Sequence, residues 1–228
     1  MIRVATFNTR HGRPPRGLAR LDLLTRQCAA LDADVLGLQE VDRHVIRSYF
    51  ADQARRIGRA LGMQVAWAPA RRPVLVGHEG NALLARGELR DVSVTELPRS
   101  PDRYTRKVVM ARVCLPDAEV SVAVTHLQNH GPEAAEQLPV LIERFGTYPE
   151  PRVLLGDLNL RRHEAVPILD DAGYTVADGG PTSPADAPYQ QIDFVAVRGL
   201  AIVSARVPPT SVSDHRPLVA ELRLVSDR

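Results

Sequence analysis

The chain has 228 residues, of which 44% are hydrophobic and 25% are charged. This length fits one large domain over residues 1–228, and the composition is typical of an ordinary soluble globular protein. The formal net charge is only +2 at pH 7, so no strong overall field attracts nucleic acid or an anionic membrane.

The cysteines and the first residues bear on the cellular compartment. Cys28 and Cys114 have no CxxC or other metal-type spacing, and they fall in a helical and a strand pattern. Buried thiols in a reducing compartment are therefore expected. Residues 1–7 already read as a core strand, without a leader or an apolar run long enough to span a bilayer. We expect a cytoplasmic protein, most simply a monomer.

The first half of the chain alternates between short apolar runs and amphipathic stretches. The expected order is a strand over residues 2–7, a loop over 13–17, a helix over 18–31, a strand over 34–41, a helix over 48–61, a strand over 64–68 and a loop over 69–79. The first helix rests on apolar residues at helical spacing that begin at Leu18. The loop over 69–79 rests on its arginines and prolines.

The second half contains more strands than helices. The expected strands cover residues 80–86, 88–97, 107–115, 119–125, 152–157, 174–177, 191–197, 201–207 and 218–225, the expected helices 132–145 and 163–172, and the expected loops 98–106, 178–188 and 211–217. The loop over 178–188 is expected at the surface because it is rich in Gly, Pro, Ala and Asp. Strands outnumber helices by more than two to one, which indicates a layered α/β domain with mixed sheets.

The run at residues 152–159 ends a buried strand in Gly156, Asp157, Leu158 and Asn159. Residues two apart on a strand face the same side, so Asp157 and Asn159 are expected to project together. A carboxylate and a carboxamide placed in this way suit a water or metal site. Taken alone, the segment is better explained as a strand followed by a polar turn.

Other strands end in the same way, which reverses that preference. The polar residues at the strand ends are Asn8, Glu40, Asn81, His126, Asp157, Asn159, Asp193, Asp214 and His215. Layered α/β sheets gather functional side chains where strands end and loops begin. Oxygen ligands without cysteine favour Mg²⁺ or Mn²⁺ over a structural zinc, and the histidines suit acid/base or phosphate-stabilising roles.

In this order the motifs resemble those of the endonuclease/exonuclease/phosphatase superfamily. The motifs are Phe7-Asn8, Leu38-Gln39-Glu40-Val41, Gly80-Asn81-Ala82, Thr125-His126-Leu127, Gly156-Asp157-Leu158-Asn159, Ile192-Asp193 and Ser213-Asp214-His215. The resemblance spans residues 6–217. It implies a four-layered α/β/β/α sandwich, two packed sheets flanked by helices, and a metal-dependent phosphoesterase.

The resemblance also implies a role for each residue. It implies Glu40 as the main metal ligand, with Asn8 and Asp214 near the metal. Asp157 would orient or deprotonate the attacking water, and Asn159 would steady that water or the phosphate. His215, held by Asp193, would bond to the scissile phosphate, and His126 would be a second histidine facing the phosphate. Asn81, Arg106 and Arg10 are the expected substrate-binding residues, and Arg106 matches only loosely. The expected cofactor is Mg²⁺ or Mn²⁺.

The substrate is open among three hypotheses. A nuclease for DNA or RNA is slightly favoured over a phosphodiesterase or phosphatase for a lipid headgroup or a small molecule. An inactive binding protein is the distant alternative, because the set of acidic, amide and histidine residues is intact. Arginine-rich loops over residues 10–20, 43–56 and 69–79 are the candidate nucleic-acid contacts, but such runs are usually solvated surface.

Overall fold

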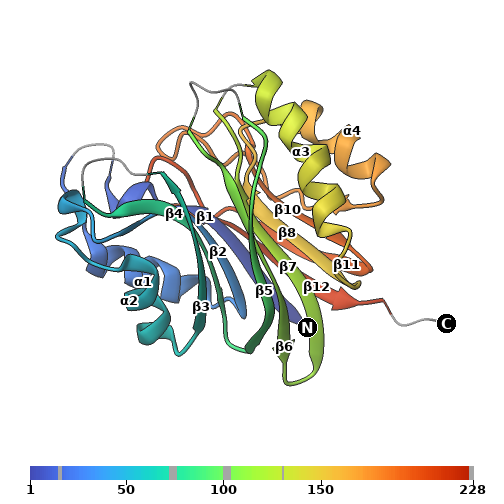
Figure 1. Ribbon diagram of the computed structural model, residues 1–228, viewed down its shortest axis with the longest axis horizontal. Coiled ribbons are helices and arrows are strands. Elements are labelled where there is room, and N and C mark those ends of the chain that lie inside the picture. Colours follow the sequence, from blue (N-terminus) through green and yellow to red (C-terminus); the bar gives the residue numbers. More distant parts are fainter. Residues whose placement is uncertain (15–16, 72–75, 100–103, 130, 226–228) are drawn as a thin grey trace.

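The computed structural model describes residues 1–14, 17–71, 76–99, 104–129 and 131–225. Two six-stranded β-sheets pack face to face, and helices cover their outer faces (Figure 1). The four-layered α/β/β/α sandwich expected from the sequence is therefore confirmed.

The first sheet has the strand order β11-β12-β1-β2-β4-β3. Its strands are β1 (Ile2–Asn8), β2 (Val35–Arg43), β3 (Gln64–Arg71), β4 (His78–Ala85), β11 (Leu200–Arg206) and β12 (Leu218–Leu224). Only β1 and β2 run parallel, and the other neighbours are antiparallel.

The second sheet has the order β5-β6-β7-β8-β10-β9. Its strands are β5 (Glu88–Glu96), β6 (Lys107–Leu115), β7 (Ala118–His126), β8 (Arg152–Asp157), β9 (Thr175–Val176) and β10 (Asp193–Arg198). Here β7 and β8 form the one parallel pair among the described strands. Each sheet thus contains one parallel pair near its middle.

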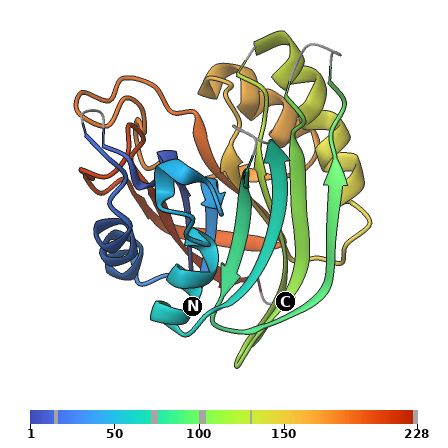
Figure 2. The same ribbon diagram turned by 60° about the vertical axis from the view of Figure 1, so that its left-hand side comes forward.

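Two helices lie against each sheet, as Figure 2 shows from a second side. They are α1 (Leu21–Leu31) and α2 (Gln53–Leu61) on the first sheet, and α3 (Gly131–Phe145) and α4 (Arg162–Asp171) on the second. Two short 3₁₀ turns, η1 (Arg10–Gly12) and η2 (Ile46–Ser48), follow β1 and β2. None of the described helices has the length and apolarity that a bilayer span requires.

The central core lies between the two sheets and consists mainly of valine, alanine and leucine. Val35 and Leu83 of the first sheet belong to one cluster with Val122 and Leu155 of the second. At Gly37 the sheets come so close that a Cβ atom would lie 3.0 Å from Cβ of Leu155. The absence of a side chain therefore sets the distance between the layers at this point.

Both helices of the first half begin later than the sequence predicted. The predicted helix over 18–31 starts at Leu21, and Leu18 is 71% exposed. The predicted helix over 48–61 starts at Gln53, because Tyr49 and Phe50 have positive φ angles of 56° and 59°. The side chain of Asp52 caps this helix by accepting a hydrogen bond from the backbone N–H of Arg55.

Two predicted loops were partly wrong. Residues 69–79 were expected to form a loop, but β3 continues to Arg71 and β4 begins at His78. The loop over 178–188 is not wholly on the surface, because Thr182, Ser183 and Ala185 are buried. Residues 72–75, like residues 15–16 and 100–103 of two other predicted loops, lie outside the described part of the chain.

The two cysteines differ in environment. Cys28 is fully buried in the layer between the helices and the first sheet, as expected, and burial raises the pKa of its thiol to about 12. Cys114 was expected to be buried, but it is only half-buried on β6. Cys114 lies near the end of β6, where it pairs with Glu88 of β5 on one side and Glu119 of β7 on the other.

Candidate active site

The parallel pairs of the two sheets bring their polar ends to one place. In the first sheet Asn8 at the end of β1 pairs with Gln39 of β2, next to Glu40. In the second sheet Asp157 at the end of β8 pairs with His126 of β7 on one side and with Asp193 of β10 on the other. The strand ends that the sequence singled out therefore meet across both sheets.

Asp157 stands at the centre of this cluster and is buried. Its Oδ2 accepts a hydrogen bond from Nδ2 of Asn8 at 2.8 Å and lies 3.5 Å from Nε2 of His126. Its Oδ1 accepts a hydrogen bond from the backbone N–H of Asn159 at 3.0 Å. The Asn159 side chain donates to the carbonyl oxygen of Leu127 at 3.0 Å, so the whole turn after β8 is fixed.

Burial raises the pKa of two of the three carboxyl groups that line the pocket. The pKa of Glu40 rises to about 7 through burial and the charges of Glu79 and Asp157. The pKa of Asp157 rises to about 6 through burial and the charge of Asp193. Both groups therefore titrate near neutral pH, where a proton acceptor for water is most effective.

His215 is held by Asp193, as the sequence predicted. Its Nδ1 lies 2.9 Å from Oδ2 of Asp193 and 3.8 Å from Oδ2 of Asp157. Burial lowers the pKa of this imidazole, but the charges of Asp193 and Asp157 outweigh burial and raise the pKa to about 10. The ring is therefore a positively charged hydrogen-bond donor at neutral pH.

His126 behaves in the opposite way. Burial, the Arg106 guanidinium and the charge of His215 hold its pKa well below the ordinary value for histidine. It is 5% exposed and close to Asp157. The two histidines therefore differ in protonation, with His215 charged and His126 neutral.

These residues surround a pocket of about 250 Å³. The lining residues are Asn8, Glu40, Arg71, Glu79, Tyr104, Arg106, His126, Asn129, Asp157, Asn159 and His215. Seven of the predicted site residues belong to this lining, and Asp193 lies directly behind His215. Carboxylates, charged nitrogen groups and amides thus share one small, polar cavity.

Besides Asp193, three predicted site residues do not line the pocket. Asn81 is buried and donates through Nδ2 to the carbonyl oxygen of Lys107 at 2.9 Å, so it connects the two sheets. Arg10 and Asp214 pair with each other, with Nε 3.3 Å from Oδ2. Both side chains are about one-third exposed or more, at 34% and 40%. The structure thus brings Arg10 and Asp214 together beside the pocket rather than in it.

Two site residues have a backbone conformation that the sequence did not indicate. Glu40 has a φ angle of 53°, within a register shift of β2 against β4 between Leu38 and Val41. Asn159 has a φ angle of 50°. Bulges and left-handed residues re-aim side chains and gather at functional sites. The conformation of Glu40 does not follow from a sequence pattern, because glutamate is not a usual left-handed residue, whereas asparagine adopts this conformation more readily.

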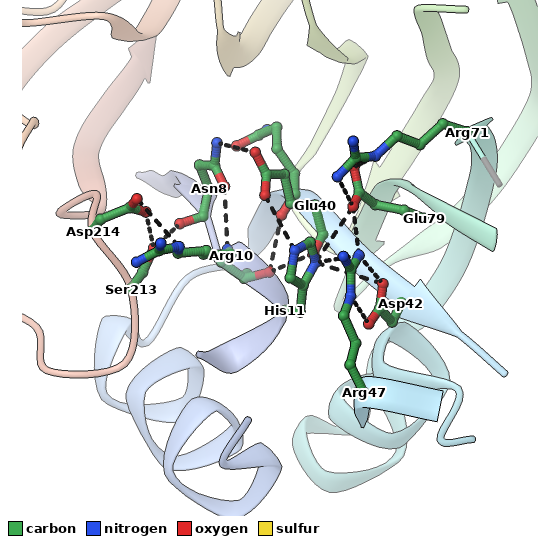
Figure 3. A network of polar contacts seen from close by, with 12 residues as sticks. Asn8, Arg10, His11, Glu40, Asp42, Arg47, Arg71, Glu79, Ser213 and Asp214 are labelled. Atoms are coloured by element: carbon green, nitrogen blue, oxygen red, sulfur yellow. Dashed lines mark hydrogen bonds and ion pairs between the residues drawn. The ribbon is translucent and has the colours of Figure 1, made fainter. Parts of the chain in front are cut away.

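A polar network supports Glu40 from below (Figure 3). Nδ1 of His11 lies 2.9 Å from the carbonyl oxygen of Glu40, and Nε2 lies 3.5 Å from its Oε2. Arg47 forms two hydrogen bonds with Asp42, at 2.8 and 2.9 Å, and one with Glu79 at 2.6 Å. The carboxylates of Asp42 and Glu79 are therefore neutralised by guanidinium groups of the protein.

The donor set of the pocket fits a hard divalent cation. The carboxylates of Glu40 and Asp157 both accept hydrogen bonds from Nδ2 of Asn8, so they lie close together and offer oxygen ligands without sulfur. Asp193 Oδ1 is buried and has no hydrogen-bond partner among the described residues. The group of His11, Asp42 and Glu79 has ligand atoms close enough together for a metal, but Arg47 already occupies its carboxylates.

The sequence patterns did not indicate four of the pocket residues, Arg71, Glu79, Tyr104 and Asn129. Arg71 and Glu79 were assigned to a loop, yet they are neighbours on paired strands, and Glu79 is only 4% exposed. A charged residue directly before the Gly80-Asn81 motif was the available signal for Glu79. Nothing in the sequence marked Asn129.

Comparisons with known proteins agree with this geometry. The sequence pattern of the Endonuclease/Exonuclease/phosphatase family matches residues 5–215. A UPF0294 protein of Yersinia pseudotuberculosis is 28% identical over 93 residues, which are 39% of this chain and 36% of that protein. The chain therefore matches little more than a third of the length of this curated relative.

Solved structures share the fold over almost the whole chain. An endonuclease/exonuclease/phosphatase from Beutenbergia cavernae has a TM-score of 0.79 at 20% identity, covering 98% of this chain and 71% of that one. The mannosyl-6-phosphatase of Bacteroides thetaiotaomicron has a TM-score of 0.78 at 16% identity, covering 98% of this chain and 100% of that one. At such identities these likenesses concern the fold alone.

This chain belongs to the Endonuclease/Exonuclease/phosphatase family. Members of this family are hydrolases that act on phosphate esters and depend on divalent metal ions. The resemblance noted in the sequence is thereby confirmed, and the pocket at the strand ends is the candidate active site.

Proposed function

We propose that this protein is a metal-dependent phosphoesterase that hydrolyses its substrate by attack of an activated water. The observation that carries the proposal is the buried cluster around Asp157, in which Asn8, His126 and His215 all approach one carboxylate oxygen. A carboxylate with a pKa of about 6, held by fixed donors, is suited to accept a proton from water.

His215 supplies the positive charge on the protein side. Its ring nitrogen that does not face Asp193 is free to donate a hydrogen bond to a nonbridging phosphate oxygen. Charge that develops on that oxygen during attack is then stabilised by a donor whose position is already fixed. Asp193 holds the ring in orientation and keeps it protonated.

Glu40, with Asn8 beside it, would hold the divalent ion, which we propose to be Mg²⁺ or Mn²⁺. When bound, such an ion neutralises charge on the phosphate and the leaving oxygen. Asp214 lies beside the pocket in a pair with Arg10, so we propose for it a supporting role near the ion rather than direct coordination.

The arginine-rich loops bear on the substrate. Several described arginines of these loops pair with carboxylates of the protein, Arg10 with Asp214, Arg43 with Asp52 and Arg56 with Asp22. A paired arginine contributes less to a phosphate-binding surface than a free one. We therefore place a small phosphate ester ahead of DNA or RNA, which reverses the slight preference drawn from the sequence.

A structural relative supports placing a small phosphate ester ahead of nucleic acid as the substrate. The mannosyl-6-phosphatase named above has the same fold, so the fold accommodates a phosphatase for a small phosphorylated molecule. Nuclease activity is the second candidate, since the family name includes nucleases. We further propose a single-domain, monomeric, cytoplasmic protein, in keeping with two free thiols.

A substrate panel tests the proposal. The panel contains plasmid DNA, RNA, bis-p-nitrophenyl phosphate, p-nitrophenyl phosphate and inositol phosphates, each with Mg²⁺, Mn²⁺ or EDTA. Metal-dependent hydrolysis should be lost in Glu40→Ala and His215→Ala, and Asp157→Asn should lower kcat by roughly 10²–10⁴-fold. No hydrolysis of any substrate, together with no metal binding by calorimetry, would disprove the enzyme.

A further inference from the structure

Two arginines line the pocket together with the carboxylates of Glu40 and Asp157. Arg106 comes from the segment before β6, and Arg71 ends β3. The reaction proposed above uses the carboxylates and the histidines but does not need two guanidinium groups. Their role is therefore a separate question.

Arg106 is a buried cation without a carboxylate partner. It is only 8% exposed, and its one side-chain hydrogen bond runs from Nε to Oε1 of Gln128 at 3.4 Å. Among the described residues, neither Nη1 nor Nη2 donates to any acceptor, and no ion pair is formed. Burial of this charge is costly. The carboxylates of Asp157, Glu40 and Glu79 offset part of the cost without a direct contact, and an anion bound directly to the guanidinium would offset more of it.

Arg71 is held firmly but keeps one edge free. Its Nε and Nη2 donate to the two carboxylate oxygens of Glu79, each at 2.8 Å. The ring of Tyr104 lies 4.9 Å from its guanidinium carbon. Within the described part of the chain, Nη1 has no acceptor. Figure 3 shows Glu79 shared between Arg71 and Arg47, so the guanidinium of Arg71 is fixed from behind.

Gln128 connects the two arginine positions. Its Oε1 accepts from Arg106, and its Nε2 donates to the carbonyl oxygen of Tyr104, the residue whose ring covers Arg71. Burial, and to a lesser extent the charge of Arg71, lowers the pKa of Arg106. The two cations therefore repel each other, and an anion bound in the pocket that both of them line would relieve this repulsion.

We propose that Arg71 and Arg106 form a subsite that selects the terminal phosphate of a phosphomonoester. This inference rests on the proposed phosphoesterase function. A terminal phosphate has three nonbridging oxygens and a charge of about −1.5 to −2 at pH 7, whereas an internal phosphodiester has two such oxygens and one charge. The free N–H groups of the two guanidiniums match the additional oxygen and charge.

The test compares two chromogenic substrates, p-nitrophenyl phosphate and bis-p-nitrophenyl phosphate, in the presence of Mn²⁺. Wild-type protein should prefer the monoester. Arg71→Ala should lower kcat/KM for the monoester by about 10–100-fold, the loss expected for a hydrogen bond to a charged group, and by less than about 3-fold for the diester. Arg71→Lys keeps the charge and should lose less than Arg71→Ala.

Arg43→Ala is the matched control, because Arg43 lies over Trp67 and pairs with Asp52 away from the pocket. It should leave both substrates unchanged. Equal losses on monoester and diester in Arg71→Ala, or no loss on either, would overturn the subsite. Melting temperatures identify any variant that fails to fold, and Arg71→Lys then carries the comparison.

A binding measurement separates this inference from the proposed function. Calorimetry with inorganic phosphate and Mn²⁺ needs no turnover. Wild-type protein and Arg43→Ala should bind phosphate equally, and Arg71→Ala at least about 10-fold more weakly. If wild-type protein hydrolyses neither substrate but shows this binding pattern, the subsite stands and the proposed function fails. If the three proteins bind phosphate equally, the subsite fails.

Discussion

The pair of Asp193 and His215 has the shortest histidine–carboxylate contact among the described site residues, at 2.9 Å. Because the pKa of His215 is raised to about 10, the ring stays protonated through neutral pH and loses its proton only as the pH rises through that value. Activity that requires the imidazolium should therefore fall on the alkaline side.

Asp193→Asn should move this alkaline fall to lower pH. Removing the carboxylate charge of Asp193 should lower the pKa of His215 by about 1–3 units, which is the usual effect of losing one neighbouring opposite charge. The measurement is the pH profile of kcat/KM, with an NMR titration of the His215 ring as a readout independent of turnover. Full turnover with an unshifted profile in this variant would show that Asp193 has no such role.

His11 touches both the carbonyl oxygen and the carboxylate of Glu40, so it is a positioning residue for a proposed metal ligand. Its φ angle is 59°, and asparagine tolerates this conformation without bridging to the carboxylate. His11→Asn should therefore weaken Mn²⁺ binding by about 10–100-fold, as is usual for residues that orient a ligand.

Isothermal titration of Mn²⁺ into the metal-free protein measures this effect. His163→Ala is the control, because His163 is an exposed residue in the first turn of α4. It should bind Mn²⁺ as wild-type protein does. Unchanged Mn²⁺ affinity in His11→Asn would mean that the contact with Glu40 does not orient the ligand.

At the scale of the elements, the parallel pair β7 and β8 carries His126 and Asp157 side by side. Gly156 lies directly before Asp157, and a Cβ atom there would meet the carbonyl oxygen of Thr125 at 2.6 Å. A glycine at such a position permits either a close approach of two backbones or a turn. The structure places it in a close approach between these two strands.

Gly156→Ala should therefore separate the two strands and lower the free energy of unfolding by about 1–3 kcal/mol, the usual cost of overpacking. Chemical denaturation measures this change. Gly131→Ala is the control, because nothing lies within 4 Å of its added Cβ atom. If the two variants have the same stability, the close contact at Gly156 has no energetic consequence.

The strand pattern was largely predictable because most strands are short apolar runs that end in a polar residue. The strand over residues 107–115 agrees with β6 residue for residue. Helix starts were less predictable, since the left-handed Tyr49 and Phe50 depend on contacts that the local sequence does not encode. The strand ends that carry Asn8, His126 and Asp157 followed from the pattern, whereas the Arg71–Glu79 pair required the pairing of β3 with β4.

At the scale of the whole molecule, the net charge of +2 does not show that surface charges and pocket charges are arranged differently. Arginines and carboxylates pair on the surface, as at Arg3 with Asp32 and Arg112 with Glu119. Such exposed pairs contribute little to stability. The carboxylates in the pocket, in contrast, are buried beside each other. In the metal-free protein the charges of Glu79 and Asp157 therefore repel the charge of Glu40.

This repulsion predicts how stability depends on pH and metal. The folded-state pKa values of Glu40, about 7, and Asp157, about 6, lie above the ordinary values for these residues. The metal-free folded state therefore binds protons more tightly than the unfolded state. Stability from these two groups is greatest below their ordinary pKa values, near pH 4, and is lost as the pH rises through about 6 to 7.

A bound divalent ion should offset this loss, because it favours the ionised carboxylates and binds only the folded state. At about 100 times the dissociation constant of the ion, the gain is about 2.7 kcal/mol. Melting curves at pH 8 should therefore show a higher Tm with Mn²⁺ than with EDTA, and the difference should shrink as the pH falls toward 5.

Glu40→Gln distinguishes this explanation from a general salt effect, because it removes one buried charge and keeps the shape of the side chain. In EDTA at pH 8 the variant should melt at a higher temperature than wild-type protein, since the repulsion with Glu79 and Asp157 is gone. It should also lose most of the gain from Mn²⁺. A variant that melts lower than wild-type protein in EDTA would show that Glu40 does not destabilise the metal-free protein. A variant that keeps the full Mn²⁺ gain would show that Glu40 is not a ligand of the ion. Such opposite effects on stability and metal binding are expected where a site is built for function at the expense of the fold.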